Sequence, residues 1–366
     1  MSEVLDSIIA AIDGTVVVSF IAGSGIILTR AKVLDRAGAE TFGKIIIYLL
    51  LPCLLFTNML LYVDVSDVKN FGIAFGLATF HSVVGCGLGW ILARLTGARR
   101  EIRRLIMCCL GFQDTTAYPL AYAIVLGGNS VTDKDKNFKD RATEYVLIYT
   151  IFIVIYKWTI GWEIMMKKRS SRLPGTEIIN KSDITPENIG HSRYLLWKIK
   201  RGMTPPIWAA IFAIPFAFIP YSQEYLWTGS GSILRKNIFQ AMLSFGGCAS
   251  PLISFILGSN LSHGYPATAD ISNLHIAVIL LGRLVLMPLI GLGAIGGLYY
   301  LGVIGRIMTL MMQICFAAPI SLQLLVICED RKNQEENLSK VVVFAYGFAT
   351  IMMPLWTSIF LVLLYD

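Results

Sequence analysis

The sequence predicts an all-α integral membrane protein with ten transmembrane helices. Hydrophobic residues make up 55% of the 366 residues and charged residues only 15%, and the mean hydropathy is +0.65. A soluble globular surface needs more polar residues than this. Apolar stretches of about 20 residues, the length that crosses a hydrocarbon core, recur along the chain, and prolines interrupt several of them in a repeated pattern. We therefore expect a multi-pass membrane protein that contains broken helices.

Each apolar stretch is expected to be one membrane-spanning helix. Glu3 and Asp6 precede the first stretch, where a cleavable signal would carry basic residues, so this stretch is predicted to be a span as well. The sixth stretch is short and bracketed by prolines. The predicted spans cover residues 7–29, 40–61, 71–92, 104–126, 143–165, 205–220, 237–259, 273–300, 307–328 and 341–364.

The basic residues predict the orientation of the chain. The connections after spans 1, 3, 5, 7 and 9 carry more than twice as many Lys and Arg residues as those on the opposite side. Cytosolic loops are enriched in Lys and Arg. We therefore expect both termini on the non-cytosolic side of the endoplasmic reticulum or plasma membrane. Residues 167–202 are expected to form a cytosolic loop between a first half, 1–166, and a second half, 203–366.

The two halves are expected to be inverted repeats, because an odd number of spans in each makes them enter the membrane from opposite sides. Prolines occupy matching places in the halves, at Pro52 and Pro119, then Pro251 and Pro319. A glutamine, Gln113 or Gln313, lies six residues before the second proline of each half. Helices interrupted at corresponding positions indicate the substrate site of a secondary transporter. A plain kink is the alternative, above all for Pro52 and Pro251.

Polar side chains crowd the turn before Pro119. A broken helix leaves backbone groups unpaired at mid-membrane depth, which is tolerated only where they are buried in protein or line a wet cavity. Asp114 could accept a hydrogen bond from solute, carry a proton or hold a cation; a helix cap is the alternative. For the neutral polar residues the alternative is an interhelical hydrogen bond. The expected substrate-binding residues are Gln113, Asp114, Thr115, Thr116, Pro119, Gln313 and Pro319.

Arg283, His81 and Lys157 also lie within predicted spans. Arg283 in span 8 needs a partner, and Asp114 is the expected one; anion attraction, a structural ion pair and snorkelling stay open. His81 in span 3 is expected to be a packed core histidine, with a proton relay as the alternative. Charge pairing or coupling is therefore assigned to Arg283, His81 and Asp114. Lys157 is expected to snorkel or to line a lateral surface.

Composition argues against several other functions. The cysteines show no CxxC spacing and the four histidines are scattered, so we expect no metal site, no cofactor and no enzyme activity. The net charge of +7 lies mainly in loops beside apolar spans, where membrane topology explains it, so nucleic acid is not an expected partner. The expected partners are a small organic solute and the lipid bilayer, and a homodimer stays open. A channel also stays open, because broken helices build pores too.

Five segments in the same order give the chain a family resemblance. They are YLLLPCLLF in span 2, GFQDTTAYPLAYAIVLGG in span 4, SPLISFILGSNLS at the end of span 7, GRLVLMPLIG in span 8 and VVVFAYGFATIMMPLWTSIFLVLL at the C-terminus. With these segments the chain resembles the auxin efflux carrier family, that is, the PIN-type and PIN-like carriers. The short loop at 167–202 makes its layout most similar to the PIN-like members.

The resemblance implies a fold in which helices 4 and 9 cross at Pro119 and Pro319. It also implies a scaffold of helices 1, 2, 6 and 7 beside a transport unit of helices 3–5 and 8–10 that moves as an elevator. The implied solute is an organic anion, typically indole-3-acetate. Asp114 departs from the small neutral residue usual there, and an acid beside an anion needs a proton or a partner. A proton- or sodium-coupled carrier of a different organic solute therefore stays open.

Overall fold

The computed structural model contains helices throughout the part of the chain that it describes. Within those residues the regular secondary structure is helical, and β-type pairing is limited to an isolated bridge, so the all-α class is confirmed. Thr116 and the predicted cytosolic loop at 167–202 lie outside the described residues. These comprise 2–62, 68–115, 117–128, 132, 135, 137–165, 205–218, 227, 235–263, 269–331 and 334–365.

All ten apolar segments coincide with helices, and four of these helices contain a π-helical turn, labelled η. The helical elements, in chain order, are α1 (Ser2–Arg30), α2 (Arg36–Ile45), η1 (Ile46–Leu50), α3 (Leu51–Tyr62), α4 (Val68–Leu95), α5 (Arg100–Gly111), α6 (Ala117–Leu126), α7 (Phe138–Tyr156), η4 (Lys157–Gly161), α8 (Trp162–Ile164), α11 (Pro205–Phe218), η6 (Arg235–Phe239), α13 (Gln240–Gly247), α14 (Ala249–His263), α15 (Asn273–Leu281), η7 (Gly282–Leu286), α16 (Met287–Tyr300), α17 (Arg306–Ala317), α18 (Gln323–Arg331) and α19 (Glu335–Tyr365).

Six helical stretches in the described chain are long and apolar enough to cross a membrane, which makes this an integral multi-pass protein. The stretches are Arg36–Leu61, Lys69–Leu95, Phe138–Ile164, Asn237–Ser262, Asn273–Tyr300 and Glu335–Tyr365. The predicted spans 4 and 9 fall short because each is split. α5 and α17 have 12 residues each, about 18 Å of helix at 1.5 Å per residue, against a hydrocarbon core of about 30 Å. Ten spans in two inverted repeats remain a prediction.

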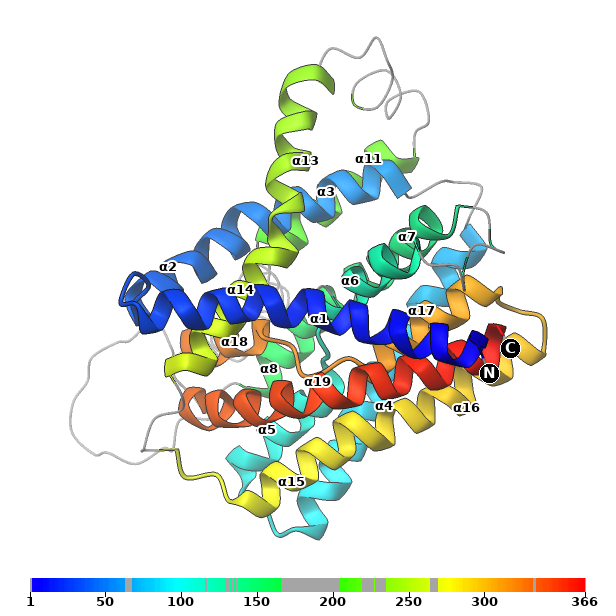
Figure 1. Ribbon diagram of the computed structural model, residues 1–366. Helices are drawn as coiled ribbons and strands as arrows, with labels where there is room; N and C mark the ends of the chain where they lie inside the picture. The colour runs from blue at the N-terminus through cyan, green and yellow to red at the C-terminus, as the bar shows by residue number, and fades with distance from the viewer. Residues whose placement is uncertain are drawn as a thin grey trace, which may run out of the picture.

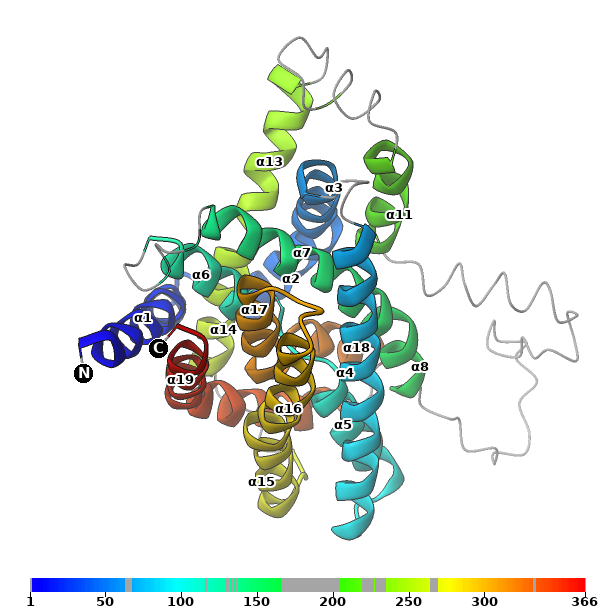
Figure 2. The same ribbon diagram turned by 90° about the vertical axis from the view of Figure 1, so that its right-hand side faces the viewer.

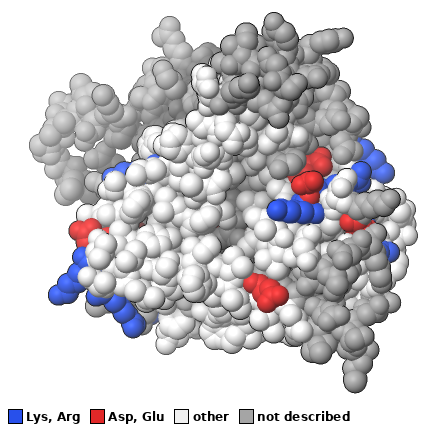
Figure 3. Space-filling model, turned by 45° about the horizontal axis from the view of Figure 1, so that its top comes forward, with Lys and Arg blue, Asp and Glu red and all other residues white. Residues whose placement is uncertain are grey.

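The surface carries a broad uncharged area, as a membrane-embedded protein requires. In Figure 3 most charged side chains lie toward two opposite sides of the view, and the region between them is almost entirely uncharged. Large apolar side chains are exposed on many helices, among them Phe20, Leu95, Phe212 and Ile351. In water such exposure would be costly, whereas in lipid these side chains are solvated by acyl chains.

The helices form a layered bundle. α1 and α19 lie side by side and run antiparallel, so the start of α1 and the end of α19 meet at one end of the bundle (Figures 1 and 2). α3 packs against α11 and α13, and these three form the upper part of both views. α17 lies in the interior, against α16 and α7. The interrupted helix α17 is therefore inside the bundle, where the candidate site is also expected.

α1 and α14 touch backbone to backbone. A Cβ atom at Gly25 would overlap the carbonyl oxygen of Phe255, and one at Gly258 would overlap that of Ala22. Glycine at both positions is what lets the two helices approach this closely. A hydrogen bond from Thr29 Oγ1 to Ser259 Oγ, 2.9 Å long, continues the contact. The pair therefore packs without a layer of side chains between its backbones.

Candidate functional site

Two helix interruptions form the centre of the site. The first break, residues 112–115, lies between α5 and α6, and the second break, residues 318–322, separates α17 from α18. Pro319 accounts for the second: the residue before a proline is disfavoured in helical geometry, and Ala318 has φ −57° and ψ 145°. Pro119 does not lie in the first break. It is buried in the first turn of α6, where a proline costs no helical hydrogen bond.

The two breaks pair with each other through their backbones. Gln113 and Ile320 form an antiparallel β-bridge. The amide of Asp114 donates to the Pro319 carbonyl at 2.8 Å, and the amide of Ser321 donates to the Phe112 carbonyl at 3.2 Å. These bonds satisfy groups that a broken helix would otherwise leave unpaired in an apolar interior. The two breaks therefore lie side by side although about 200 residues separate them in the sequence. Their polar residues must meet in this way if they form one site.

The two glutamines do not occupy equivalent places. Gln113 lies in the first break and its Nε2 donates to the Tyr149 hydroxyl at 2.6 Å. Gln313 lies within α17, a full turn before that helix ends. Both side chains are buried, and the Oε1 atom of each has no hydrogen-bond donor within the described residues. The structure thus offers two carbonyl acceptors, although not at the matched positions that the proline spacing suggested.

Asp114 is buried, at 3% exposure, and binds to a helix far along the chain. Its Oδ2 lies 3.1 Å from the Tyr346 hydroxyl of α19, which is also 3.0 Å from the Ile320 carbonyl of the second break. One tyrosine therefore contacts both breaks. The neighbouring Thr115 is buried too, and its carbonyl accepts a hydrogen bond from Thr150 Oγ1 at 3.4 Å.

Arg283 contacts the ends of both interrupted helices, and the predicted pairing with Asp114 is wrong. Its Nη1 donates to the Leu110 carbonyl near the end of α5 at 3.2 Å. Its Nη2 and Nε donate to the Phe316 and Ala318 carbonyls at the end of α17, at 3.0 and 2.8 Å. Helix C-termini present unpaired carbonyls and partial negative charge. The guanidinium therefore caps two helix ends at once, which is why it needs no carboxylate.

His81 completes the environment of Arg283. Its Nε2 lies 2.8 Å from Arg283 Nη1, so this nitrogen accepts a hydrogen bond and the imidazole is the neutral Nδ1–H tautomer. The ring packs edge-on against Phe316, with 4.3 Å between centroids. This geometry favours the expected packed core histidine. A proton relay through His81 stays untested.

Lys157 does not snorkel, contrary to the expectation from its sequence. It is 1% exposed, and its Nζ donates to Ser321 Oγ at 2.6 Å and to Gln323 Oε1 at 3.2 Å. Ser321 lies in the second break and Gln323 begins α18. The reason lies in the helix: Lys157 begins the π-helical turn η4, and such turns are frequent at functional sites. Arg283 likewise lies on a π-helical turn, η7.

Sequence reasoning missed four members of this site. They are Lys157, Ser321, Tyr149 and Tyr346. Lys157 carried a usable signal, because a lysine well inside an apolar span is rare and normally faces the protein interior. The tyrosines and the serine carried none, since such residues are common in membrane helices and only their partners distinguish them.

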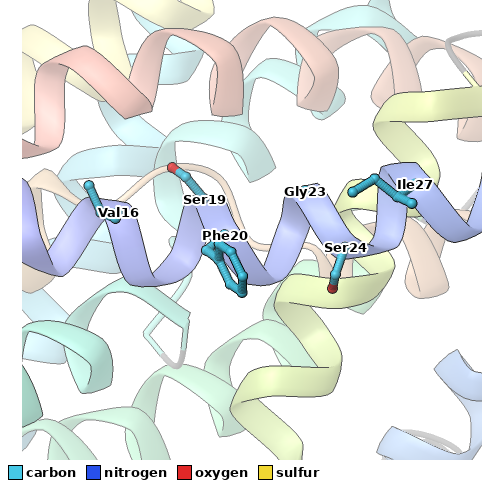
Figure 4. A pocket seen from close by; sticks show the side chains of 6 residues that line it. All are labelled: Val16, Ser19, Phe20, Gly23, Ser24 and Ile27. Carbon is cyan, nitrogen blue, oxygen red and sulfur yellow. The ribbon is translucent and has the colours of Figure 1, made fainter.

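A groove on the outer face of α1 is separate from this site. It is lined by Val16, Ser19, Phe20, Gly23, Ser24 and Ile27 (Figure 4). None of these residues belongs to either break, and Phe20 is 79% exposed. Within the described chain no three His, Cys, Asp or Glu side chains gather closely enough to hold a metal ion.

Interrupted helices that pair inside a multi-span bundle are typical of one class of protein, the membrane transporters with discontinuous helices. The comparison with known families agrees. Residues 11–357 match the family of membrane transport proteins, and the chain belongs to that family. The resemblance to the auxin efflux carriers is thereby confirmed, because the relatives include PIN-like proteins.

The relatives are distant in sequence but match over most of their length. An uncharacterized transporter of Schizosaccharomyces pombe is 20% identical over 95% of this chain and 96% of its own. The protein PIN-LIKES 1 of Arabidopsis thaliana is 21% identical over 91% of this chain and 75% of its own. PIN-LIKES 5 of the same plant is 21% identical over 92% of both chains.

Proposed function

We propose that this transporter moves a small organic anion, an auxin-like carboxylate or a related compound, by elevator-type alternating access, with the solute bound at the paired breaks. The observation that carries the proposal is the meeting of the two breaks in the interior, lined by buried polar groups. Such a site offers hydrogen bonds to a polar solute at mid-membrane depth, where lipid offers none.

The polarity of the site supports an organic solute with both a charged and a neutral end. The amide oxygens of Gln113 and Gln313 await donors, whereas Lys157 and the starts of α6 and α18 present positive charge. The breaks and the adjoining end of α17 also contain buried apolar residues, among them Phe112, Phe316 and Ile320. Apolar walls with a few placed polar groups are typical of small-molecule sites.

The packing of the helices supports a rigid-body movement. α1 packs on α14, and α3 packs on α11 and α13, which are pairs within the expected scaffold. α4 packs on α5 and α7, and α16 packs on α17, which are pairs within the expected transport unit. An elevator requires two units of this kind, and the boundary between them would run through the contacts of α1 with α6 and α19.

The test is uptake by purified protein in liposomes. We first screen indole-3-acetate, phenylacetate, other organic acids, amino acids and neutral indoles for thermal stabilisation at two pH values, with and without sodium. The expected result is stabilisation by monocarboxylates, followed by saturable uptake of the same compounds. Unitary currents in planar bilayers would instead show a channel. Saturable uptake of neutral or cationic solutes alone would overturn the anionic assignment and indicate a carrier of another solute. Dependence of uptake on sodium or on pH would identify the coupling ion.

A further inference from the structure

Lys157 is an ammonium group buried among neutral partners. Its two acceptors, Ser321 Oγ and Gln323 Oε1, carry no formal charge. An ammonium has three donors, so one has no acceptor within the described residues. Burying a charge without an opposite charge is costly unless something else compensates for it. The third donor of Lys157 can therefore bind a further acceptor.

Asp114 does not fill this role, although it lies within electrostatic range of Lys157. No ion pair joins the two side chains in the described chain, where the two ion pairs found both involve Arg36. The carboxylate of Asp114 is directed instead at Tyr346. The ammonium therefore keeps a donor available for a further anionic group.

The element that Lys157 binds is itself positive. Ser321 and Gln323 lie at the N-terminal end of α18, where the helix dipole places partial positive charge. Asp114 lies just before α6 and supplies negative charge at the matching place in the first break. At the start of α18 the adjacent side chain is Lys157, a cation, so the partial positive charge of this helix end has no negative side chain to balance it. An anion bound there would interact favourably with both the helix end and the ammonium.

The charges of the buried side chains indicate how many negative charges the anion carries. The acidic residue that is buried in the described chain is Asp114, and the buried basic residues, with His81 set apart, are Arg283 and Lys157. With each in its charged form, they sum to one positive charge. His81 is neutral, as its contact with Arg283 requires. A monoanion brings this total to zero, whereas a dianion leaves an uncompensated negative charge inside the membrane, which costs a few kcal/mol.

We propose that Lys157 binds the carboxylate of the solute beside Ser321 and the start of α18, and that it restricts the solute to a single negative charge. This assignment rests on the proposed function and names the residue that recognises the anion. Ser321 contributes its hydroxyl, which can turn from accepting the Lys157 donor to donating to the carboxylate.

The experiment compares Lys157→Met with the wild type on three matched probes. These are phenylacetate, the neutral phenylacetamide and the dianion homophthalate. Wild-type protein is expected to prefer phenylacetate over each of the others by at least tenfold, both in binding and in competition for uptake. Lys157→Met is expected to lose most of the preference for carboxylate over amide. Lys44→Met is the matched control, because Lys44 is exposed on α2, and it should keep the wild-type preferences.

A purely structural role for Lys157 would lower all affinities together and leave the preference ratio unchanged, which would overturn the assignment. Ser321→Ala provides a second variant if Lys157→Met does not fold, and it should reduce the same ratio several-fold. Equal binding of phenylacetate and homophthalate by the wild type would overturn the restriction to one charge. Binding with the expected preference but without uptake would support Lys157 and overturn transport, so the two proposals fail separately.

Discussion

Two buried cations contact helix ends, and their bonding differs. Arg283 contacts the ends of α5 and α17, whereas Lys157 contacts the start of α18. Arg283 reaches three carbonyls and His81, so all its contacts are with groups that need a donor. Lys157 reaches two neutral side chains at a helix end that is already positive. Both side chains extend from π-helical turns. A cation at a negative helix end stabilises the fold, whereas a cation at a positive end prepares a site for an anion.

The largest difference should appear in stability. Arg283→Met would leave three buried carbonyls without a donor, and each unsatisfied group costs about 1–3 kcal/mol, so the free energy of unfolding should fall by several kcal/mol. Lys157→Met leaves two side-chain acceptors without this donor but also removes the cost of burying an unpaired charge, so its loss should be much smaller. Thermal unfolding of both variants in detergent measures the contrast, and Arg283→Lys should fall between Arg283→Met and the wild type. Equal losses for the two methionine variants would contradict the distinction between the cations.

Removing the negative charge of Asp114 also tests the comparison between the two buried cations. In Asp114→Asn the amide can still bind Tyr346, so folding should change by about 1 kcal/mol or less. The buried site becomes more positive, so KM for a monocarboxylate should fall several-fold and dicarboxylates should become better substrates. Uptake between pH 5 and pH 8 measures both effects. Unchanged KM and unchanged charge preference over that range would remove Asp114 from the mechanism.

The smallest effect is expected for an exposed cation. Arg36 contacts Glu335 at 3.2 Å, but its side chain is 59% exposed. Exposed ion pairs contribute about 0.2–1 kcal/mol and weaken with salt. Arg36→Ala should therefore shift Tm by no more than a few degrees, with a smaller shift at high salt. A loss of stability as large as that of Arg283→Met would mean that burial does not explain the difference in stability between the exposed and the buried cations.

Much of the architecture could be predicted from sequence. Hydropathy located every helical segment, because lipid imposes a minimum apolar length. Pro319 and the polar residues around Asp114 indicated where the chain is interrupted, since proline and unpaired backbone have few tolerated places in a membrane. The first break was placed only approximately: it precedes Pro119, which begins α6 without causing the interruption.

The partners could not be predicted, for a physical reason. Arg283 was expected to bind Asp114 because opposite charges attract, but helix carbonyls offered three bonds in better geometry. Lys157 was expected to snorkel because lysine has a long flexible stem, yet a π-helical turn directs it inward. Spacing along one helix says nothing about which groups face it from a helix 160 residues away.

The contact of α1 with α14 has a mechanical consequence. Two helices whose backbones touch at Gly25 and Gly258 cannot slide past each other without first separating, because no flexible side chains lie between them to rearrange. α1 meets α6 differently, through a 2.7 Å bond between the hydroxyls of Thr15 and Tyr122, which can break and reform. If the helices of the bundle slide past one another, the movement should therefore occur between α1 and α6, and α1 and α14 should move together as one rigid body.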